Sequence, residues 1–138
     1  MVYRKASQRK RLEKLKAYYS DLREMKVSSY EEYLKDKKSR YSIERLLLLI
    51  AEAILDFLDH LLASQHRVVS DSYEEIIENA RKYKVISLDL YDRLKGLGGF
   101  RNVLAHGYLK LDDQEVFKNY QKMLEIANEV LAEFEKTV

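Results

Sequence analysis

The chain has 138 residues, with 25 Lys and Arg against 23 Asp and Glu, and it contains neither cysteine nor proline. This length favours one domain, 1–138, with its own hydrophobic core. The lack of cysteine excludes disulfides, thiol nucleophiles and cysteine-ligated zinc, and it fits a reducing compartment. Only four glycines and no proline are available for turns, so we expect an all-α protein rather than a β-rich one.

Two helices are predicted in the first part of the chain. Apolar residues recur at spacings of three and four over residues 4–26, which is typical of an amphipathic helix. Ser29 fits the cap of a short helix that ends near Lys37, and Glu32 stands where a side chain reaches back to the cap amide. No apolar stretch follows the first residues, so no signal peptide is visible and a cytoplasmic location is expected.

The next predicted helix, over residues 40–65 with Ser39 as its cap, is apolar around most of its circumference. A helix of this kind should lie at the centre of the fold. Its most apolar stretch carries four polar side chains, Glu52, Asp56, Asp59 and His60. A membrane span tolerates few charges, so we interpret this stretch as a buried helix and expect no membrane association.

Three further helices complete the prediction. Residues 72–82 and 87–106 each begin with a serine that fits an N-cap, and Asp112 or Asp113 caps the last helix. No segment alternates polar and apolar residues for long, so no strand is predicted. The expected fold is a single up-and-down bundle of five or six helices.

Charge is distributed unevenly along the chain. Residues 1–40 hold 13 Lys and Arg against 6 Asp and Glu, whereas residues 41–138 hold 12 against 17. A basic first helix can attract phosphate backbones, which would suit a nucleic-acid binder without chemistry. A solvated helix face is the commoner cause of such a pattern. Residues 1–9 form a basic lead-in to which the sequence assigns no role.

His106 has the most distinctive surroundings of the three histidines. Gly98 and Gly99 precede it and Gly107 follows it. A glycine inside a helix costs about 1 kcal/mol relative to alanine, so we expect another helix or a ligand to approach the backbone at the pair. Gly107 fits a left-handed cap that ends the helix at His106, where the helix dipole favours a protonated imidazole.

Arg101 and His106 are five residues apart, which is about 140° of rotation on a regular helix, so they do not share one face. Two copies related by a two-fold axis would gather two arginines and two histidines into one cleft. Such a cleft suits cleavage of an RNA phosphodiester without metal. Arginine binds phosphate and stabilises transition-state charge, one histidine takes the 2′-hydroxyl proton, and the other protonates the leaving oxygen.

The stretch around His106 resembles the motif of the HepT-like toxins of the HEPN superfamily. That motif is an arginine, four residues, a histidine, any residue and a tyrosine, which here are Arg101, His106 and Tyr108. Asn102 matches the polar residue after the arginine. The resemblance covers roughly residues 10–135, including segments 40–45, 50–56 and 72–75 and the helix after Asp112.

The resemblance implies a homodimer with the motif in a cleft at its interface, acting as a metal-independent endoribonuclease and as the toxin of a type VII-like toxin–antitoxin pair. It implies Arg101 and His106 as catalytic residues, Arg101 and Asn102 as RNA-phosphate ligands, and no cofactor. The implied partner is an MntA-like minimal nucleotidyltransferase antitoxin that transfers AMP from ATP onto Tyr108. The bulk and negative charge of AMP would exclude an RNA phosphate. Without the resemblance, Tyr108 is better interpreted as an aromatic residue that caps a helix end.

Two acidic residues are candidates for a supporting role. Glu52 and Asp56 are four residues apart and lie on one face of the predicted central helix. Either of them orients Arg101 or His106, or they belong to a structural ion pair or to a solvated stripe of the helix. The alternative function follows from the second interpretation: a non-catalytic nucleotide- or protein-binding partner of a nucleotidyltransferase, in which Arg101 pairs with an acid for structural reasons.

Overall fold

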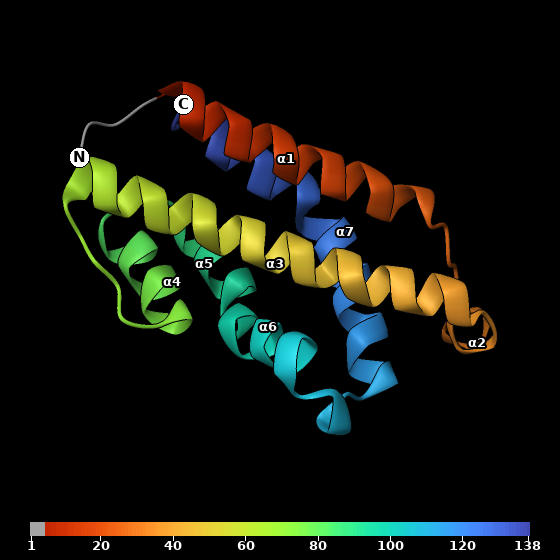
Figure 1. Cartoon of the computed structure of the whole chain (residues 1–138). Coiled ribbons are helices and arrows are strands. Elements are labelled where there is room, and N and C mark those ends of the chain that lie inside the picture. Colours follow the sequence, from red (N-terminus) through yellow and green to blue (C-terminus); the bar gives the residue numbers. More distant parts are fainter. Residues whose placement is uncertain (1–4) are drawn as a thin grey trace.

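The structure, a computed structural model, describes residues 5–138 apart from the Tyr108 side chain. Within this range the chain forms seven α-helices, one 3₁₀ turn and no strand (Figure 1). The all-α class predicted from the sequence is confirmed. The elements are α1 (Lys5–Glu24), α2 (Tyr30–Lys35), α3 (Lys37–His66), α4 (Tyr73–Lys82), α5 (Leu88–Leu94), α6 (Leu97–His106), η1 (Tyr108–Lys110) and α7 (Asp113–Glu135).

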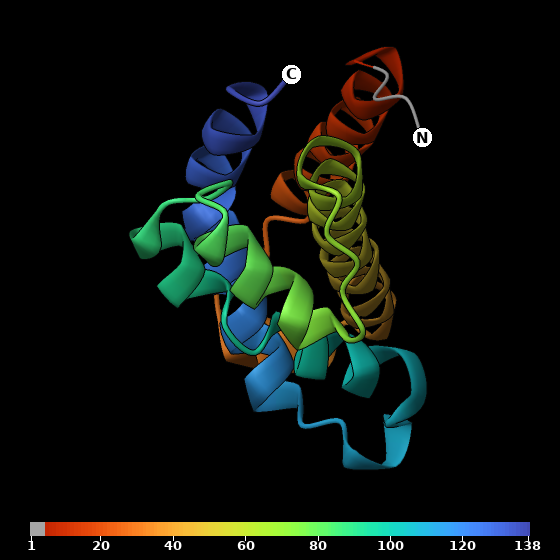
Figure 2. The same cartoon turned by 90° about the vertical axis from the view of Figure 1, so that its left-hand side faces the viewer.

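The longest helix, α3, lies at the centre, as its apolar circumference predicted. Figure 1 shows α1 antiparallel to α3 on one side, with α4 and α6 on the other side. Helix α7 packs against α1 and α3, and α5 packs against both α4 and α7 (Figure 2). The end of α7 lies beside the beginning of α1, where Arg9 Nη1 is 2.6 Å from Glu135 Oε2.

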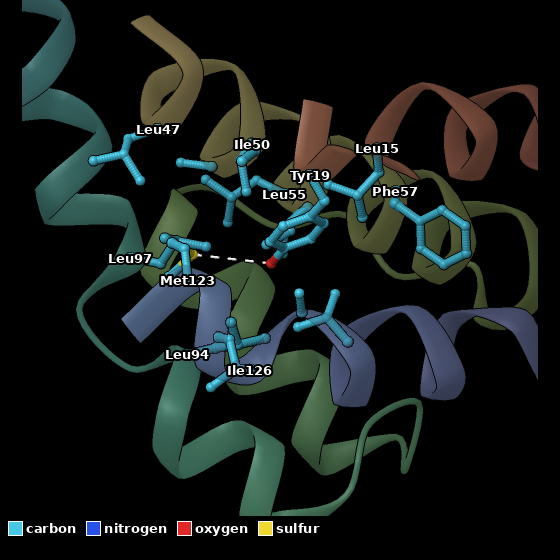
Figure 3. Packing of buried hydrophobic residues seen from close by; sticks show 14 of the residues in the cluster. Leu15, Tyr19, Leu47, Ile50, Leu55, Phe57, Leu94, Leu97, Met123 and Ile126 are labelled. Carbon is cyan, nitrogen blue, oxygen red and sulfur yellow. Dashed lines mark hydrogen bonds between the residues drawn. The ribbon is translucent and has the colours of Figure 1, made fainter. Parts of the chain in front are cut away.

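The core lies between α1, α3 and α7. Figure 3 shows its middle, where the Tyr19 hydroxyl donates a hydrogen bond to Met123 Sδ over 4.0 Å. The rings of Phe57 and Phe134 stack with their centroids 4.3 Å apart. The buried polar side chain of Gln8 donates from Nε2 to the carbonyl oxygen of Phe57 over 2.9 Å. Residues 5–9 of the basic lead-in are therefore part of the packed helix α1, and residues 1–4 lie outside the described range.

Three of the four predicted serine caps are confirmed. The hydroxyl oxygens of Ser29, Ser72 and Ser87 each accept a hydrogen bond from the amide three residues later, at 3.1 Å. The expected return contact of Glu32 is displaced by one residue, because its carboxylate accepts from the Ser28 amide rather than from the Ser29 amide. At the last helix, the Asp112 carboxylate accepts from the Gln114 amide over 2.9 Å, so Asp112 rather than Asp113 is the cap.

The predicted start of the central helix is wrong by three residues. Asp36, not Ser39, caps α3, because its Oδ1 accepts from the Lys38 and Ser39 amides over 3.1 and 3.3 Å. Ser39 lies inside the helix, and its hydroxyl donates to Asp36 Oδ2 over 2.7 Å. The aspartate three residues upstream therefore accepts hydrogen bonds from the exposed amides in place of the serine.

The helix predicted over residues 87–106 is in fact two helices. Gly96 has φ +87°, a left-handed conformation that interrupts the helical hydrogen bonds between α5 and α6. The prediction of a left-handed cap at Gly107 is wrong, since this residue has φ −99°. The helix nevertheless ends at His106 as expected, and the Gly107 amide closes its last turn by donating to the Val103 carbonyl over 2.9 Å.

None of the helices within residues 5–138 combines the length with the apolar composition that crossing a bilayer requires.

Candidate functional site

Arg101 is held by three groups from three different helices. Its Nη2 donates to Glu52 Oε1 on α3 over 3.1 Å, and its Nη1 donates to the neighbouring Asn102 Oδ1 over 3.2 Å. The guanidinium carbon lies 5.0 Å from the ring centroid of Tyr73, the first residue of α4. Only 17% of the Arg101 side chain is exposed. The guanidinium is therefore oriented before any ligand arrives, which lowers the entropic cost of binding.

Arg101 lines a cleft of about 470 Å³ that opens over α3. The floor consists of α3 residues, and Arg101 and Tyr73 stand on one side of it. The opposite wall belongs to α1. The lining residues are Arg11, Lys14, Tyr18, Leu49, Glu52, Ala53, Leu55, Asp56, Asp59, Tyr73, Ile76 and Arg101.

The start of α6 is fixed against the first turn of α4. A Cβ atom at Gly98 would lie 2.6 Å from the Tyr73 Cβ and 2.9 Å from Glu74 Oε1, so only glycine permits this approach. Glu74 Oε1 accepts from the Gly99 amide over 3.2 Å, and it thereby caps a helix whose own N-cap, Gly96, has no side chain. Another helix, α4, thus approaches the backbone at Gly98, which is one of the two occupants that the sequence predicted, whereas no neighbouring atom of the described residues lies within 4 Å of a Cβ placed at Gly99.

His106 does not share the cleft with Arg101. It is the last residue of α6, it is exposed to solvent, and it is not among the residues that line the cleft. The helix is regular from Leu97 to His106, so the predicted divergence of the two side chains holds. Asn102 is exposed beside Arg101, and the Tyr108 side chain lies outside the described part of the structure.

The structure distinguishes the two acidic candidates. Glu52 contacts Arg101, whereas the Asp56 Oδ2 lies 2.8 Å from Arg11 Nε on α1. Asp56 therefore belongs to an ion pair between α1 and α3. No sequence pattern indicated that Tyr73 contacts Arg101 or that Lys14 and Tyr18 line the same cleft. Tyr73 follows the Ser72 cap, but nothing in the local pattern indicates that its ring meets an arginine 28 residues later.

Asp59 and His60, in the C-terminal half of α3, have altered pKa values. Burial raises the pKa of Asp59, and the neighbouring Asp56 carboxylate raises it further. Burial lowers the pKa of His60, and the charge of Arg11 lowers it further. The cleft is thus lined by three cations, Arg11, Lys14 and Arg101, and by three carboxyl groups, those of Glu52, Asp56 and the partly desolvated Asp59.

Several known proteins are similar to this chain in sequence or in fold. The family model described as ribonuclease HepT-like matches residues 12–135. A curated relative, the tRNA nuclease HepT of Aphanizomenon flos-aquae (strain 2012/KM1/D3), is 31% identical over 107 residues, which cover 78% of this chain and 73% of the relative.

Two solved structures have the same fold. A tri-AMPylated Shewanella oneidensis HEPN toxin, solved in complex with an MNT antitoxin, superposes with a TM-score of 0.81 at 19% identity, covering 94% of this chain and 96% of that one. YutE of Bacillus subtilis, a cytosolic protein of unknown function, gives a TM-score of 0.69 at 22% identity, covering 94% and 86%. From the family match over residues 12–135 and the relative at 31% identity, the chain belongs to the HepT-like ribonuclease family.

Proposed function

We propose that this protein is an endoribonuclease, the toxin of a toxin–antitoxin pair, and that it cleaves RNA at a site shared by two copies of the chain. The observation that carries the proposal is the arrangement of Arg101. Its guanidinium is held by Glu52, Asn102 and Tyr73 at the edge of an open cleft, with His106 five residues later at the exposed end of the same helix.

Arg101 binds the phosphate of the scissile bond. A guanidinium presents its N–H groups in a planar fork that matches two phosphate oxygens, and it stabilises the negative charge that develops during reaction. Glu52 acts as a positioning residue, because it accepts from Nη2 and thereby fixes the plane of the guanidinium. Asn102 holds Nη1 and offers its own amide N–H group to a phosphate oxygen.

His106 supplies the proton transfers. One imidazole takes the proton from the ribose 2′-hydroxyl, whose oxygen attacks the adjacent phosphorus. The bond from phosphorus to the 5′-oxygen breaks, and a second, protonated imidazole gives its proton to that oxygen. The nucleophile belongs to the substrate, so the step proceeds without a metal. Two imidazoles are required, and the single His106 of each chain implies a homodimer.

The proposed regulator is a nucleotidyltransferase antitoxin that transfers AMP to Tyr108. The Shewanella oneidensis relative, which is tri-AMPylated and in complex with an MNT antitoxin, supports this assignment. Tyr108 follows His106 by two residues, so an AMP phosphate on its hydroxyl would compete with RNA for the same cationic groups.

The first test is digestion of a transfer-RNA pool in EDTA by the wild type, Arg101→Ala and His106→Ala. We expect the wild type to cleave, and each variant to be slower by about 10²- to 10⁴-fold, the usual contribution of general acid–base or charge stabilisation. His66→Ala is the matched control, because His66 stands at the end of α3 and its ring lies 5.4 Å from the ring of Tyr83, outside the cleft. Full activity in His106→Ala would refute the assignment.

The second test addresses the shared site. The wild type is mixed with an excess of His106→Ala and allowed to exchange subunits. Each heterodimer retains only one of the two imidazoles that the reaction requires, so the activity per wild-type chain should fall as the variant is added. If the activity per wild-type chain is unchanged, the site does not combine residues of two copies.

The Glu52–Arg101 contact also fits a second function, that of a non-catalytic partner in which the ion pair merely shapes a docking surface. This function predicts tight binding to the nucleotidyltransferase, no RNA cleavage, and no change of activity when Tyr108 is modified. Co-expression with the transferase, followed by intact mass measurement and an RNA digest, separates the two functions.

A further inference from the structure

The cleft beside Arg101 has two walls that resemble each other chemically. On one side, Arg101 lies over the Tyr73 ring at 5.0 Å; on the other, Lys14 Nζ lies 5.7 Å from the Tyr18 ring. The two pairs come from opposite sides of α3, since α1 and α4 flank this helix (Figure 1). A cation beside an aromatic face is the arrangement with which proteins bind unpaired nucleotides, because the ring stacks on the base and the cation contacts the backbone.

Some of the charged groups in the cleft already form ion pairs, and others do not. Arg101 is paired with Glu52, and Arg11 is paired with Asp56. Within the described part of the chain, Lys14 has no carboxylate and Asp59 has no cation at ion-pair distance. Among the residues described, Lys14 and Asp59 are therefore the cation and the acceptor that no ion pair occupies, and both lie in the cleft that Arg101 lines.

The size of the cleft suits a single nucleotide. Its volume of about 470 Å³ lies within the range of about 300–1,000 Å³ that is typical of small-molecule sites. A paired base cannot enter such a cleft unless it leaves the stack, and unstacking costs a few kcal/mol. An unpaired nucleotide in a loop or at an end enters without that cost.

We propose that this cleft is a subsite for one unpaired nucleotide next to the scissile phosphate. The base stacks on Tyr18, its phosphate contacts Lys14, and the ribose hydroxyl donates to Asp59. The proposal rests on the proposed function and adds its substrate class, single-stranded RNA, together with the α1 wall as the part of the protein that selects it.

The test is RNA binding in the His106→Ala background, measured by fluorescence anisotropy with a labelled single-stranded oligoribonucleotide and with the same strand annealed to its complement. Tyr18→Ala should weaken single-strand binding by about 5- to 100-fold, the usual effect of removing one stacking ring. Duplex binding should be weaker than single-strand binding before the substitution and should change little after it.

Two further variants keep the test independent of folding. Lys14 is exposed, so Lys14→Gln should leave the fold intact, while it weakens single-strand binding and makes it less dependent on salt. Tyr41→Ala is the matched control, since Tyr41 also has a cation over its ring, Arg40 at 5.5 Å, yet it is 60% exposed and lies outside the cleft. Its RNA affinity should equal that of the parent.

Three results would overturn the inference. The first is unchanged affinity in both Tyr18→Ala and Lys14→Gln, and the second is equal affinity for single strand and duplex. The third is dissociation of a dimer by either substitution in sedimentation velocity, which would make this wall an interface between copies. If the His106-intact protein cleaves RNA while affinity is unchanged, the subsite fails and the proposed function stands. If single-strand binding depends on Tyr18 but the His106-intact protein cleaves no RNA, the proposed function fails and the nucleotide subsite stands.

Discussion

The carboxylate of Glu52 and the guanidinium of Arg101 lie 3.1 Å apart, and this contact joins the central helix α3 to the end of the bundle that carries the motif. We predict that Glu52→Gln lowers the turnover rate for RNA cleavage by about five- to tenfold. This change in rate is near the lower end of what a hydrogen bond to a charged group contributes, because 43% of the Glu52 side chain is exposed to solvent.

Asp56→Asn is the matched control for Glu52→Gln. It removes a charge from the same face of α3 but breaks the ion pair with Arg11 and leaves Arg101 untouched. Turnover rate, Michaelis constant and urea unfolding are measured for both variants. A purely structural role of Glu52 would lower stability and leave the turnover rate unchanged.

The two adjacent glycines of α6 should respond in opposite ways to alanine. Gly98→Ala places a Cβ atom 2.6 Å from the Tyr73 Cβ, so it should destabilise the protein by about 1–3 kcal/mol and displace Arg101. At Gly99 no atom lies within 4 Å of such a Cβ, so Gly99→Ala should stabilise the helix by about 0.5 kcal/mol. Urea denaturation of both variants decides this. Equal destabilisation would contradict the close packing of α6 on α4.

Two buried tyrosines should also respond oppositely to the loss of their hydroxyl groups. The Tyr33 hydroxyl is buried without a hydrogen-bond partner among the described residues, so Tyr33→Phe should raise the free energy of unfolding by about 1 kcal/mol. The Tyr120 hydroxyl accepts from the Val27 amide over 3.2 Å, so Tyr120→Phe should lower it by about 1–3 kcal/mol. Thermal and urea unfolding measure both changes, and a loss of stability in Tyr33→Phe would show that its hydroxyl is satisfied.

The stability of the protein should fall on mild acidification because of His60. Burial, with the charge of Arg11, lowers the pKa of His60 in the folded state. The unfolded chain therefore takes up its proton first as the pH falls below about 6.5, and the free energy of unfolding decreases. His60→Gln cannot titrate. Between pH 7.5 and pH 5.5 the wild type should therefore lose more unfolding free energy than the variant; equal losses would exclude this cause.

The predicted elements were most accurate where the decisive contacts are local. The serine at the start of α2, α4 or α5 bonds an amide three residues away, and α3 carries its apolar character in its own composition. One of the errors occurred where two local signals competed. Asp36 and Ser39 both suit an N-cap, and only the backbone shows that Asp36 is used.

The site divides in the same way. The sequence by itself determined the end of the motif helix at His106 and the divergence of Arg101 from His106, because helical rotation and termination depend on residues within one or two turns. The start of this helix after Gly96 was missed. Only the tertiary structure decided that Glu52 rather than Asp56 meets Arg101, that Tyr73 lies beneath it, and that Lys14 and Tyr18 face it across a cleft. These contacts join residues far apart in the chain, and they depend on how α1, α4 and α6 pack around α3, which no local pattern encodes.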